Sequence, residues 1–260
     1  MATTAYRHVL LDVEAPFATV TMNRPERRNA LSLAHMEELI DCFTTLGERT
    51  DVSVVVLAGN GPAFCSGHDL SEMVDRDHAF YERLFLVCTQ LMTVIQDIPQ
   101  PVIARVHGIA TAAGCQLVAT CDLAVASDAA RFATPGVRIG LFCSTPMVAL
   151  SRNVGRKRAM EMLLTGEELD AEAARAAGLV NRVAPVAELD AQTLALARRI
   201  AEASPRVVGL GKQAFYRQLE IPQADAYELT RRVMAANAEG GDAREGITAF
   251  LEKRAPRWPE

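Results

Sequence analysis

Two nearly unbroken apolar runs limit this chain to few folds: VSVVVLAG at residues 52–59 and PVIARVHG at residues 101–108. A strand with one wet face alternates apolar and polar residues, whereas a continuous β-branched run is typical of a strand buried on both faces. Strands of this kind occur in parallel sheets that helices cover on both sides. The sequence therefore predicts an α/β fold with these two runs at its centre.

The other segments indicate where the sheet ends and a helical region begins. Two β-rich runs around Ala15-Pro16 predict a hairpin, and Ser32 predicts the cap of a helix. Short strands are expected at residues 122–127 and 131–135, but most segments after about residue 145 have helical patterns. We therefore expect an α/β core over residues 1–204 and a C-terminal helical region over residues 205–260, with the boundary at Ser204-Pro205.

Composition excludes several classes of function. The net charge of −5 gives no electrostatic support for a nucleic-acid partner. No apolar run reaches the roughly 18 residues that span a bilayer, and no secretory signal is recognisable. The six cysteines contain no CxxC pair and the five histidines are scattered, so neither a disulfide framework nor a metal site is expected. These features predict a reducing compartment, and we expect the cytoplasm.

Two places share one design: a buried strand, a loop of small residues and the start of a helix. They are VVVLAGNGPAFCSGHDL and VIARVHGIATAAGCQL. Small residues let a backbone approach a ligand closely, and a helix start leaves N–H groups without partners. Two such N–H groups can form an oxyanion hole, which stabilises an enolate or a tetrahedral intermediate. The alternative is that the small residues only allow close packing of helix on sheet.

Taken together, four stretches resemble the crotonase family, the enoyl-CoA hydratases and isomerases. They are NRPERRNALS, AFCSGHDLSEM, PQPVIARVHGIATAAGCQLVATCDLAVASDAARFATP and EGITAFLEKR, and their order along the chain matches the family. The resemblance implies a spiral of ββα units and a C-terminal helical region that forms trimers, often stacked as hexamers. It also implies an acyl-CoA thioester as substrate, with no further cofactor.

The resemblance assigns roles to individual positions. The oxyanion donors are the amides of His68 and Ala113. The two hydratase glutamates correspond to Gln116 and Gly136, so both carboxylates are missing here. The residues expected to contact coenzyme A are Ser66, Gly67, His68, Asp69 and Leu70 beside the pantetheine, and Lys212 and Lys253 near the nucleotide phosphates.

Other side chains are candidates to replace the missing glutamates, each with a simpler alternative. The His68 ring titrates near neutral pH, but its amide alone can be what acts. Cys143 and Ser144 follow a segment that lines the acyl pocket in relatives, where they can react or merely line it. In relatives a mobile helix covers the acyl chain at the stretch after the first loop, and its charged residues here can swing in or remain surface charges: Asp75, Asp77, His78 and Glu82. Asp69 is better explained as a helix cap, Asp122 as a structural residue and PERR (25–28) as a solvated charge run.

These observations favour an enzyme that stabilises a thioester enolate without the usual acid–base pair. Decarboxylation fits best because the departing CO2 creates the enolate without a base, and thioester hydrolysis with Gln116 orienting water is possible. The alternatives are a hydratase or isomerase with a displaced acid such as His68 or Glu82, and a non-catalytic acyl-CoA-binding protein. Carboxylates introduced by Gln116→Glu and Gly136→Glu are expected to raise the hydration of crotonyl-CoA.

Overall fold

The computed structural model describes residues 6–258 and contains two sheets. The larger sheet has the order β1-β2-β3-β5-β7-β10 and is parallel except for the hairpin of β1 and β2. Its strands are β1 (Val9–Glu14), β2 (Phe17–Met22), β3 (Val54–Gly59), β5 (Val102–Val106), β7 (Leu123–Ser127) and β10 (Arg182–Ala184). The hairpin and the two central strands expected from the sequence are therefore present.

The smaller sheet consists of four short strands in the order β4-β6-β8-β9. They are β4 (Ala63–Cys65), β6 (Ile109–Thr111), β8 (Arg131–Ala133) and β9 (Leu169–Asp170). Consecutive strands from β3 to β8 alternate between the two sheets, and the helix that follows each pair starts the next turn of a spiral. This is the expected spiral of ββα units. We expected loops at β4 and β6, because a strand of three residues is too short to show a period of two.

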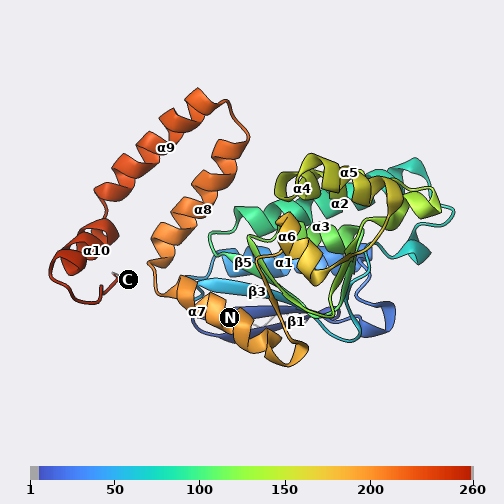
Figure 1. Ribbon diagram of the computed structural model, residues 1–260, viewed down its shortest axis with the longest axis horizontal. Coiled ribbons are helices and arrows are strands. Elements are labelled where there is room, and N and C mark those ends of the chain that lie inside the picture. The colour runs from blue at the N-terminus through green and yellow to red at the C-terminus, as the bar shows by residue number, and fades with distance from the viewer. Residues whose placement is uncertain (1–5, 259–260) are drawn as a thin grey trace.

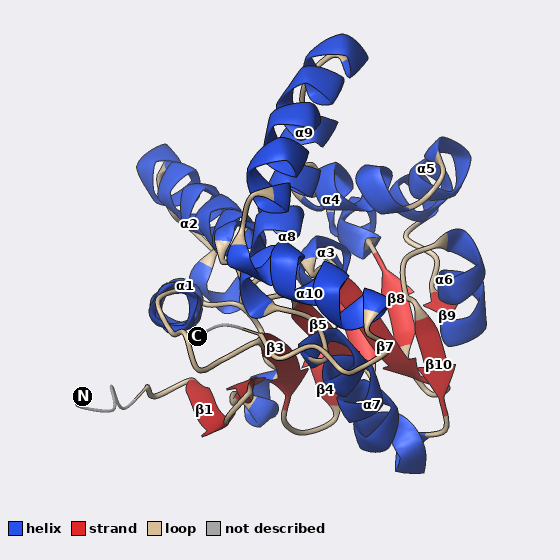
Figure 2. Cartoon of the chain, turned by 90° about the vertical axis from the view of Figure 1, so that its left-hand side faces the viewer, coloured by secondary structure: helices blue, strands red, loops and turns tan. Residues whose placement is uncertain are grey.

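Helices enclose the larger sheet on both faces (Figures 1 and 2). The α-helices of the described chain that precede Ser204 are α1 (Leu33–Gly47), α2 (His78–Asp97), α3 (Ala113–Thr120), α4 (Pro146–Asn153), α5 (Arg156–Thr165), α6 (Ala171–Ala177) and α7 (Leu189–Ala201). Alternate residues of β3 and β5 point in opposite directions. Val54 and Ile103 pack toward Leu189 of α7, while Val55 and Val102 join the main core under α1, α2 and α3. All six residues of β3 are buried, as the continuous apolar run predicts.

Three further helices form an arm that extends away from the sheets, namely α8 (Pro205–Leu219), α9 (Gln223–Ala238) and α10 (Gly241–Leu251). Figure 1 shows this arm in orange and red, set apart from the core. Ser204 caps α8 by accepting a hydrogen bond from the amide of Val207 at 3.2 Å. Between residues 6 and 258, no helix combines the length and apolar character needed to cross a membrane.

Candidate active site

A mainly apolar cavity of about 730 Å³ lies where three segments meet. The first is the loop after β4 with the 3-10 helix η2 (Leu70–Glu72), and the second is the start of α3. The third follows β8 and includes the 3-10 helix η3 (Pro135–Ile139) and the turn that leads into α4. Phe85 of α2 closes one wall. The spiral brings these segments together because each one follows a strand of the smaller sheet.

The amide of His68 is free to bind a ligand. Leu31 donates to the carbonyl of Gly67 at 2.8 Å and accepts from the amide of Asp69 at 3.1 Å, which fixes the His68 peptide between them. The His68 N–H itself has no acceptor within residues 6–258. Gly67 has φ +93, and a Cβ there would lie 2.9 Å from the Cβ of Ala112 and 3.4 Å from the nitrogen of Ala113. Glycine therefore allows the two small-residue loops to touch.

The amide of Ala113 is the second free donor. Ala113 is the first residue of α3, and a first-turn N–H has no partner inside its helix. Among the described residues it has no other acceptor, and it lines the cavity. The neighbouring Gly114 serves packing, since a Cβ there would lie 2.0 Å from the carbonyl oxygen of Cys65. Both interpretations of the small residues thus apply, each to a different residue.

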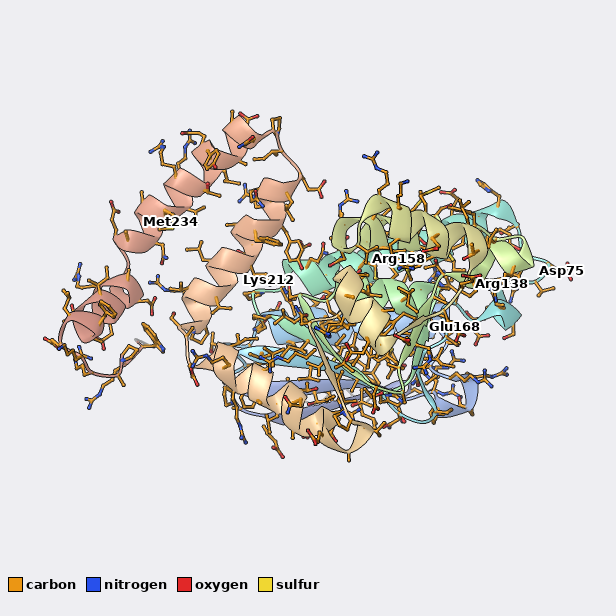
Figure 3. All side chains as sticks on the ribbon, viewed as in Figure 1. Asp75, Arg138, Arg158, Glu168, Lys212 and Met234 are labelled. Atoms are coloured by element: carbon orange, nitrogen blue, oxygen red, sulfur yellow. The ribbon has the colours of Figure 1, made fainter. Side chains whose placement is uncertain are left out.

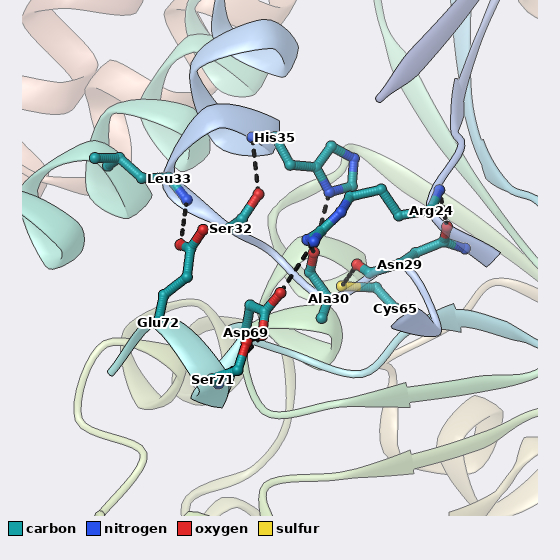
Figure 4. A network of polar contacts seen from close by, with 10 residues as sticks. All are labelled: Arg24, Asn29, Ala30, Ser32, Leu33, His35, Cys65, Asp69, Ser71 and Glu72. Carbon is teal, nitrogen blue, oxygen red and sulfur yellow. Dashed lines mark hydrogen bonds and ion pairs between the residues drawn. The ribbon is translucent and has the colours of Figure 1, made fainter. Parts of the chain in front are cut away.

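A network of hydrogen bonds and one ion pair fixes the loop that carries His68 (Figure 4). Arg24 donates to the carboxylate of Asp69 at 3.0 Å and to the carbonyl of Ala30 at 2.6 Å. Asp69 also accepts from the hydroxyl of Ser71 at 2.6 Å and from its amide at 3.2 Å. Burial works to raise the pKa of Asp69, but the bonds from Ser71 and Arg24 outweigh it and hold the pKa below its ordinary value. Asp69 lines the cavity as a cap of η2 and has no free basic role.

The ring of His68 is held without a hydrogen bond. Both ring nitrogens are buried and have no partner in the structure, and the ring meets Phe85 edge-on at 5.5 Å between centroids. Burial lowers the pKa of His68 to about 4, so the imidazole is neutral at physiological pH. A neutral imidazole carries one donor and one acceptor, and neither has a partner within the described residues.

Position 136 is closed to any side chain. A Cβ on Gly136 would lie 2.0 Å from the carbonyl oxygen of Leu141 and 2.8 Å from the sulfur of Cys143. The turn is locked by a bond of 2.9 Å from the Leu141 amide to the Gly136 carbonyl. Gly136→Glu is therefore expected to distort this turn, because the main chain and a thiol already occupy the space, and its effect on hydration stays a prediction.

Cys143 and Ser144 both line the cavity, as expected from the sequence. Cys143 is 6% exposed, and burial raises the pKa of its thiol, with the Gly136 amide working against that shift. Ser144 is exposed, and its hydroxyl donates only weakly to the carbonyl of Phe142 at 3.4 Å.

Gln116 does not line the cavity, contrary to the role we expected for it. Its side chain is 5% exposed and points toward α2, where the thiol of Cys88 approaches its Oε1 at 3.9 Å. The direction follows from the helix, because residue 116 lies one turn beyond the donor amide on a fully buried segment. Orientation of a water by Gln116 has no support in this geometry.

The acidic residues after the first loop also lie outside the cavity. Glu82 is 74% exposed and pairs with His78 at 3.6 Å on the surface of α2. Asp77 caps α2 by accepting from the amide of Phe80 at 2.9 Å. Figure 3 shows Asp75 at the outer edge of the molecule. Within the described chain, Asp69 is the one carboxylate that lines the cavity, and it is paired with Arg24.

Neither predicted phosphate-binding lysine lines the cavity. Lys212 is 9% exposed and uses its ammonium for Asp122 at 2.8 Å and for the carbonyls of Ile95 and Gln100 at 2.8 and 2.9 Å. An ammonium has three donors, so none is left for phosphate. Lys253 follows α10 on the arm, whereas Arg138, a lining residue, lies at the opposite end of the molecule in Figure 3. Our assignment of Lys212 is wrong, and Lys253 does not reach the cavity of its own chain.

Three arginines that the sequence analysis did not select line the cavity instead: Arg27, Arg28 and Arg138. Arg27 and Arg28 belong to the charge run that we interpreted as a solvated face. They are exposed and make no side-chain hydrogen bond or ion pair to the described residues. Arg28 has φ 51, a turn that brings this run beside the loop of His68. For Arg27 and Arg28, the one sequence signal of a role in the site was their position in the NRPERRNALS stretch.

Comparison with known proteins agrees with the geometry of two free amides in a ββα spiral. The sequence model described as "Enoyl-CoA hydratase/isomerase" matches residues 12–260. The chain belongs to this family. As a member of it the protein is an acyl-CoA-binding enzyme, as the resemblance implies.

Relatives cover nearly the whole chain. The human "Enoyl-CoA hydratase domain-containing protein 3, mitochondrial" is 48% identical over 92% of this chain and 79% of its own length. The Escherichia coli "2,3-dehydroadipyl-CoA hydratase" is 36% identical over 91% of this chain and 92% of its own. A crystal structure of an enoyl-CoA hydratase from Mycobacterium smegmatis is 52% identical, with a TM-score of 0.95 over 96% of this chain and 98% of that one.

The cytoplasmic location expected from the sequence is contradicted by these relatives. The human, mouse and zebrafish proteins, at 47–48% identity, are all named mitochondrial. Our argument rested on free thiols and on the absence of a secretory signal. These properties do not distinguish one reducing compartment from another, so they gave no basis for choosing the cytoplasm.

Proposed function

We propose that this protein decarboxylates a malonyl-type acyl-CoA thioester and stabilises the resulting enolate between the amides of His68 and Ala113. One observation carries the proposal: the cavity offers two free N–H donors but no free carboxylate. Hydration and isomerisation of an enoyl thioester need a base or acid in that position. Decarboxylation needs neither to form the enolate, because the electrons of the breaking C–C bond pass to the thioester.

The charges of the lining residues support an anionic substrate such as a malonyl-type thioester. Arg27, Arg28 and Arg138 give the cavity three cationic groups, against one carboxylate that is already paired. We assign Arg27 and Arg28 to the phosphates of coenzyme A, because free guanidinium groups bind phosphate oxygens in pairs. The neutral ring of His68 can donate to the leaving carboxylate or to the thioester oxygen without adding a charge.

The resemblance to crotonases supports an assembly as well. We propose that three copies associate through the arm of α8, α9 and α10, either as a trimer or as two stacked trimers. The apolar side chains that this arm exposes support the proposal. Lys253 then contacts coenzyme A only if the coenzyme lies in the cavity of a neighbouring copy.

The test is a product analysis of the purified protein with four thioesters: malonyl-, methylmalonyl-, butyryl- and crotonyl-CoA. We expect CO2 release from the first two and slow or no conversion of the others. The matched variant is Ala113→Pro, which lacks the second donor amide and should lose about 3 kcal/mol of transition-state stabilisation, or roughly 10²-fold in rate. Proline is tolerated at the first position of a helix, but it disfavours the φ of 51 and ψ of −118 of the preceding Ala112, so circular dichroism must first show that the variant is folded.

Two results would reject the proposal. Hydration of crotonyl-CoA at about 10 s⁻¹ or more, with malonyl-type thioesters unchanged, identifies a hydratase with a displaced acid. Tight binding of all four thioesters with no turnover identifies a binding protein.

A further inference from the structure

The thiol of Cys143 occupies the place of the side chain that residue 136 lacks. A Cβ at Gly136 would lie 2.8 Å from this sulfur, so the two residues share one volume. Cys143 is 6% exposed and borders the same cavity as Ala113 and His68. Among the six cysteines it is the one that lines this cavity, and the other five are buried in the packing of helices and strands.

We propose that Cys143 is the proton donor to the C2 carbon of the thioester enolate. This inference rests on the proposed function, because an enolate must first form between His68 and Ala113. Donation moves the S–H proton to C2, and the electron pair of that bond stays on sulfur. The resulting thiolate then takes a proton from water, and the products are the saturated thioester and the original thiol.

The chemistry of the neighbouring groups favours the thiol over the other candidates. A thioester enolate is far more basic than a thiolate, so the transfer is downhill even though burial raises the pKa of Cys143. The ring of His68 is neutral and lies beside the donor amide that holds the oxygen of the substrate. Ser144 is a weaker acid and is exposed to solvent. Asp69 is ionised and bound to Arg24, so it has no proton to give.

A covalent label tests the position of the thiol without relying on decarboxylation. Bromoacetyl-CoA places a bromide leaving group on the carbon equivalent to C2. Attack by the Cys143 sulfur forms a C–S bond and breaks the C–Br bond, bromide leaves with the electron pair, and the thiol proton passes to the buffer. We expect peptide mass spectrometry to find the label on Cys143, with excess butyryl-CoA preventing it and Cys143→Ala abolishing it.

A stereochemical experiment tests proton donation itself. Methylmalonyl-CoA converted in D2O should give propionyl-CoA with deuterium on one face of C2. In Cys143→Ala water must protonate the enolate from either side, so we expect a mixture of both faces and turnover lower by about 10²-fold. Cys143→Ser keeps the volume of the site and guards against a folding defect. Cys42→Ala is the matched control, since it removes a fully buried thiol on α1 and should keep the selectivity.

The outcomes separate the two proposals. Label on Cys143 together with lost face selectivity in Cys143→Ala supports the inference. A folded Cys143→Ala protein with unchanged rate and unchanged selectivity overturns it, as does labelling of another cysteine or of none. If the wild-type protein labels at Cys143 but releases no CO2, the decarboxylase function fails while the thiol is still placed beside C2.

Discussion

Ala112 has a backbone conformation that normally belongs to glycine. Its φ of 51 and ψ of −118 lie in a region that costs a residue with a Cβ roughly 1–3 kcal/mol. The amide of Ala112 is bonded to the carbonyl of Ala133 at 2.9 Å, which holds the residue in place. The next residue, Ala113, lies inside α3. The backbone strain therefore lies at Ala112 and not at Ala113.

We therefore expect Ala112→Gly to stabilise the protein. Relief of the strain outweighs the entropy that glycine adds to the unfolded chain, and the net gain should be about 1 kcal/mol. Ala113→Gly is the matched control, because Ala113 is helical and its replacement should cost about 0.5–1 kcal/mol. Urea titration measures both. Equal destabilisation by the two variants would show that Ala112 is not strained.

Two buried histidines make stability fall in mild acid. Burial lowers the pKa of His35 and of His68 to about 4, against an ordinary value of 6.5. Between these values the unfolded chain binds protons that the folded one does not, so the free energy of unfolding decreases as pH falls from 6.5 to 4. The slope should reach about 1.4 kcal/mol per pH unit for each histidine.

The variant His35→Leu isolates one of these contributions. Urea titrations at pH 7, 6 and 5 should show a pH slope smaller by about one proton than that of the wild type. His35 lies outside the cavity, so coenzyme A binding should not change. An identical slope in both proteins would mean that His35 is protonated in the folded state at these pH values.

At the scale of elements, η3 and the turn after it decide what position 136 can hold. We expect Gly136→Glu to destabilise the protein by about 3 kcal/mol, because its Cβ must displace the carbonyl of Leu141. It should also fail to increase crotonyl-CoA hydration. Gly155→Glu is the matched control, since no atom lies within 4 Å of a Cβ at this position. The free energy of unfolding of this variant should change by about 0.5 kcal/mol or less. A stable Gly136→Glu protein with faster hydration would contradict this account.

Lys212, a buried cation on α8, attaches the arm to the core. Asp122 accepts from Lys212 at 2.8 Å, from the hydroxyl of Tyr216 at 2.8 Å and from the amide of Val102 at 2.7 Å. Removal of Lys212 leaves the Asp122 carboxylate, which is 14% exposed, without its counter-charge. Lys212→Met should therefore cost about 3 kcal/mol of stability, whereas Tyr216→Phe should cost about 1 kcal/mol.

Calorimetric titration with coenzyme A adds a second measurement to these variants. Lys212→Met should bind the coenzyme as the wild type does, and Arg28→Ala should bind it more weakly with unchanged stability. Weaker binding by a folded Lys212→Met protein would restore the phosphate role that the structure denies to this lysine.

The sequence predicted the long elements better than the short ones, for physical reasons. The apolar run of β3 and the cap at Ser32 are local signals, and both appear in the structure. The strands β4 and β6 have three residues each and pair with one another across more than 40 residues of sequence. Within the site, His68, Ala113 and Cys143 were selected from the family resemblance, and all three line the cavity. The direction of Gln116 and the burial of Lys212 depend on packing between distant helices, which no local pattern records.

At the scale of the whole molecule, the arm exposes apolar side chains that a lone chain leaves in water. Phe250 is 81% exposed and Leu251 is 74% exposed, and Tyr227 and Met234 are exposed to a similar degree. Surfaces of this kind mark sites of association. Figure 1 shows that α9 and α10 stand clear of the core, and α9 packs mainly against α8.

We expect static light scattering at micromolar concentration to give three or six times the chain mass of 28.2 kDa. Phe250→Asp places a charge in the proposed contact and should shift the protein toward the monomer. Glu239 is an exposed position on the same arm, and Glu239→Gln is a control that should not change the mass. A wild-type monomer in this experiment would leave the apolar arm without an explanation.

The closed turn at Gly136 also restricts how such a sequence can evolve. A single substitution that puts a carboxylate at position 136 meets a main-chain carbonyl, so the two-glutamate arrangement is not one mutation away. We therefore expect a carboxylate there to require a rebuilt turn from Leu141 to Cys143. Glycine at 136 and the turn after it should therefore be inherited together. Among relatives, a carboxylate at this position should accompany a different length or path of the segment before α4.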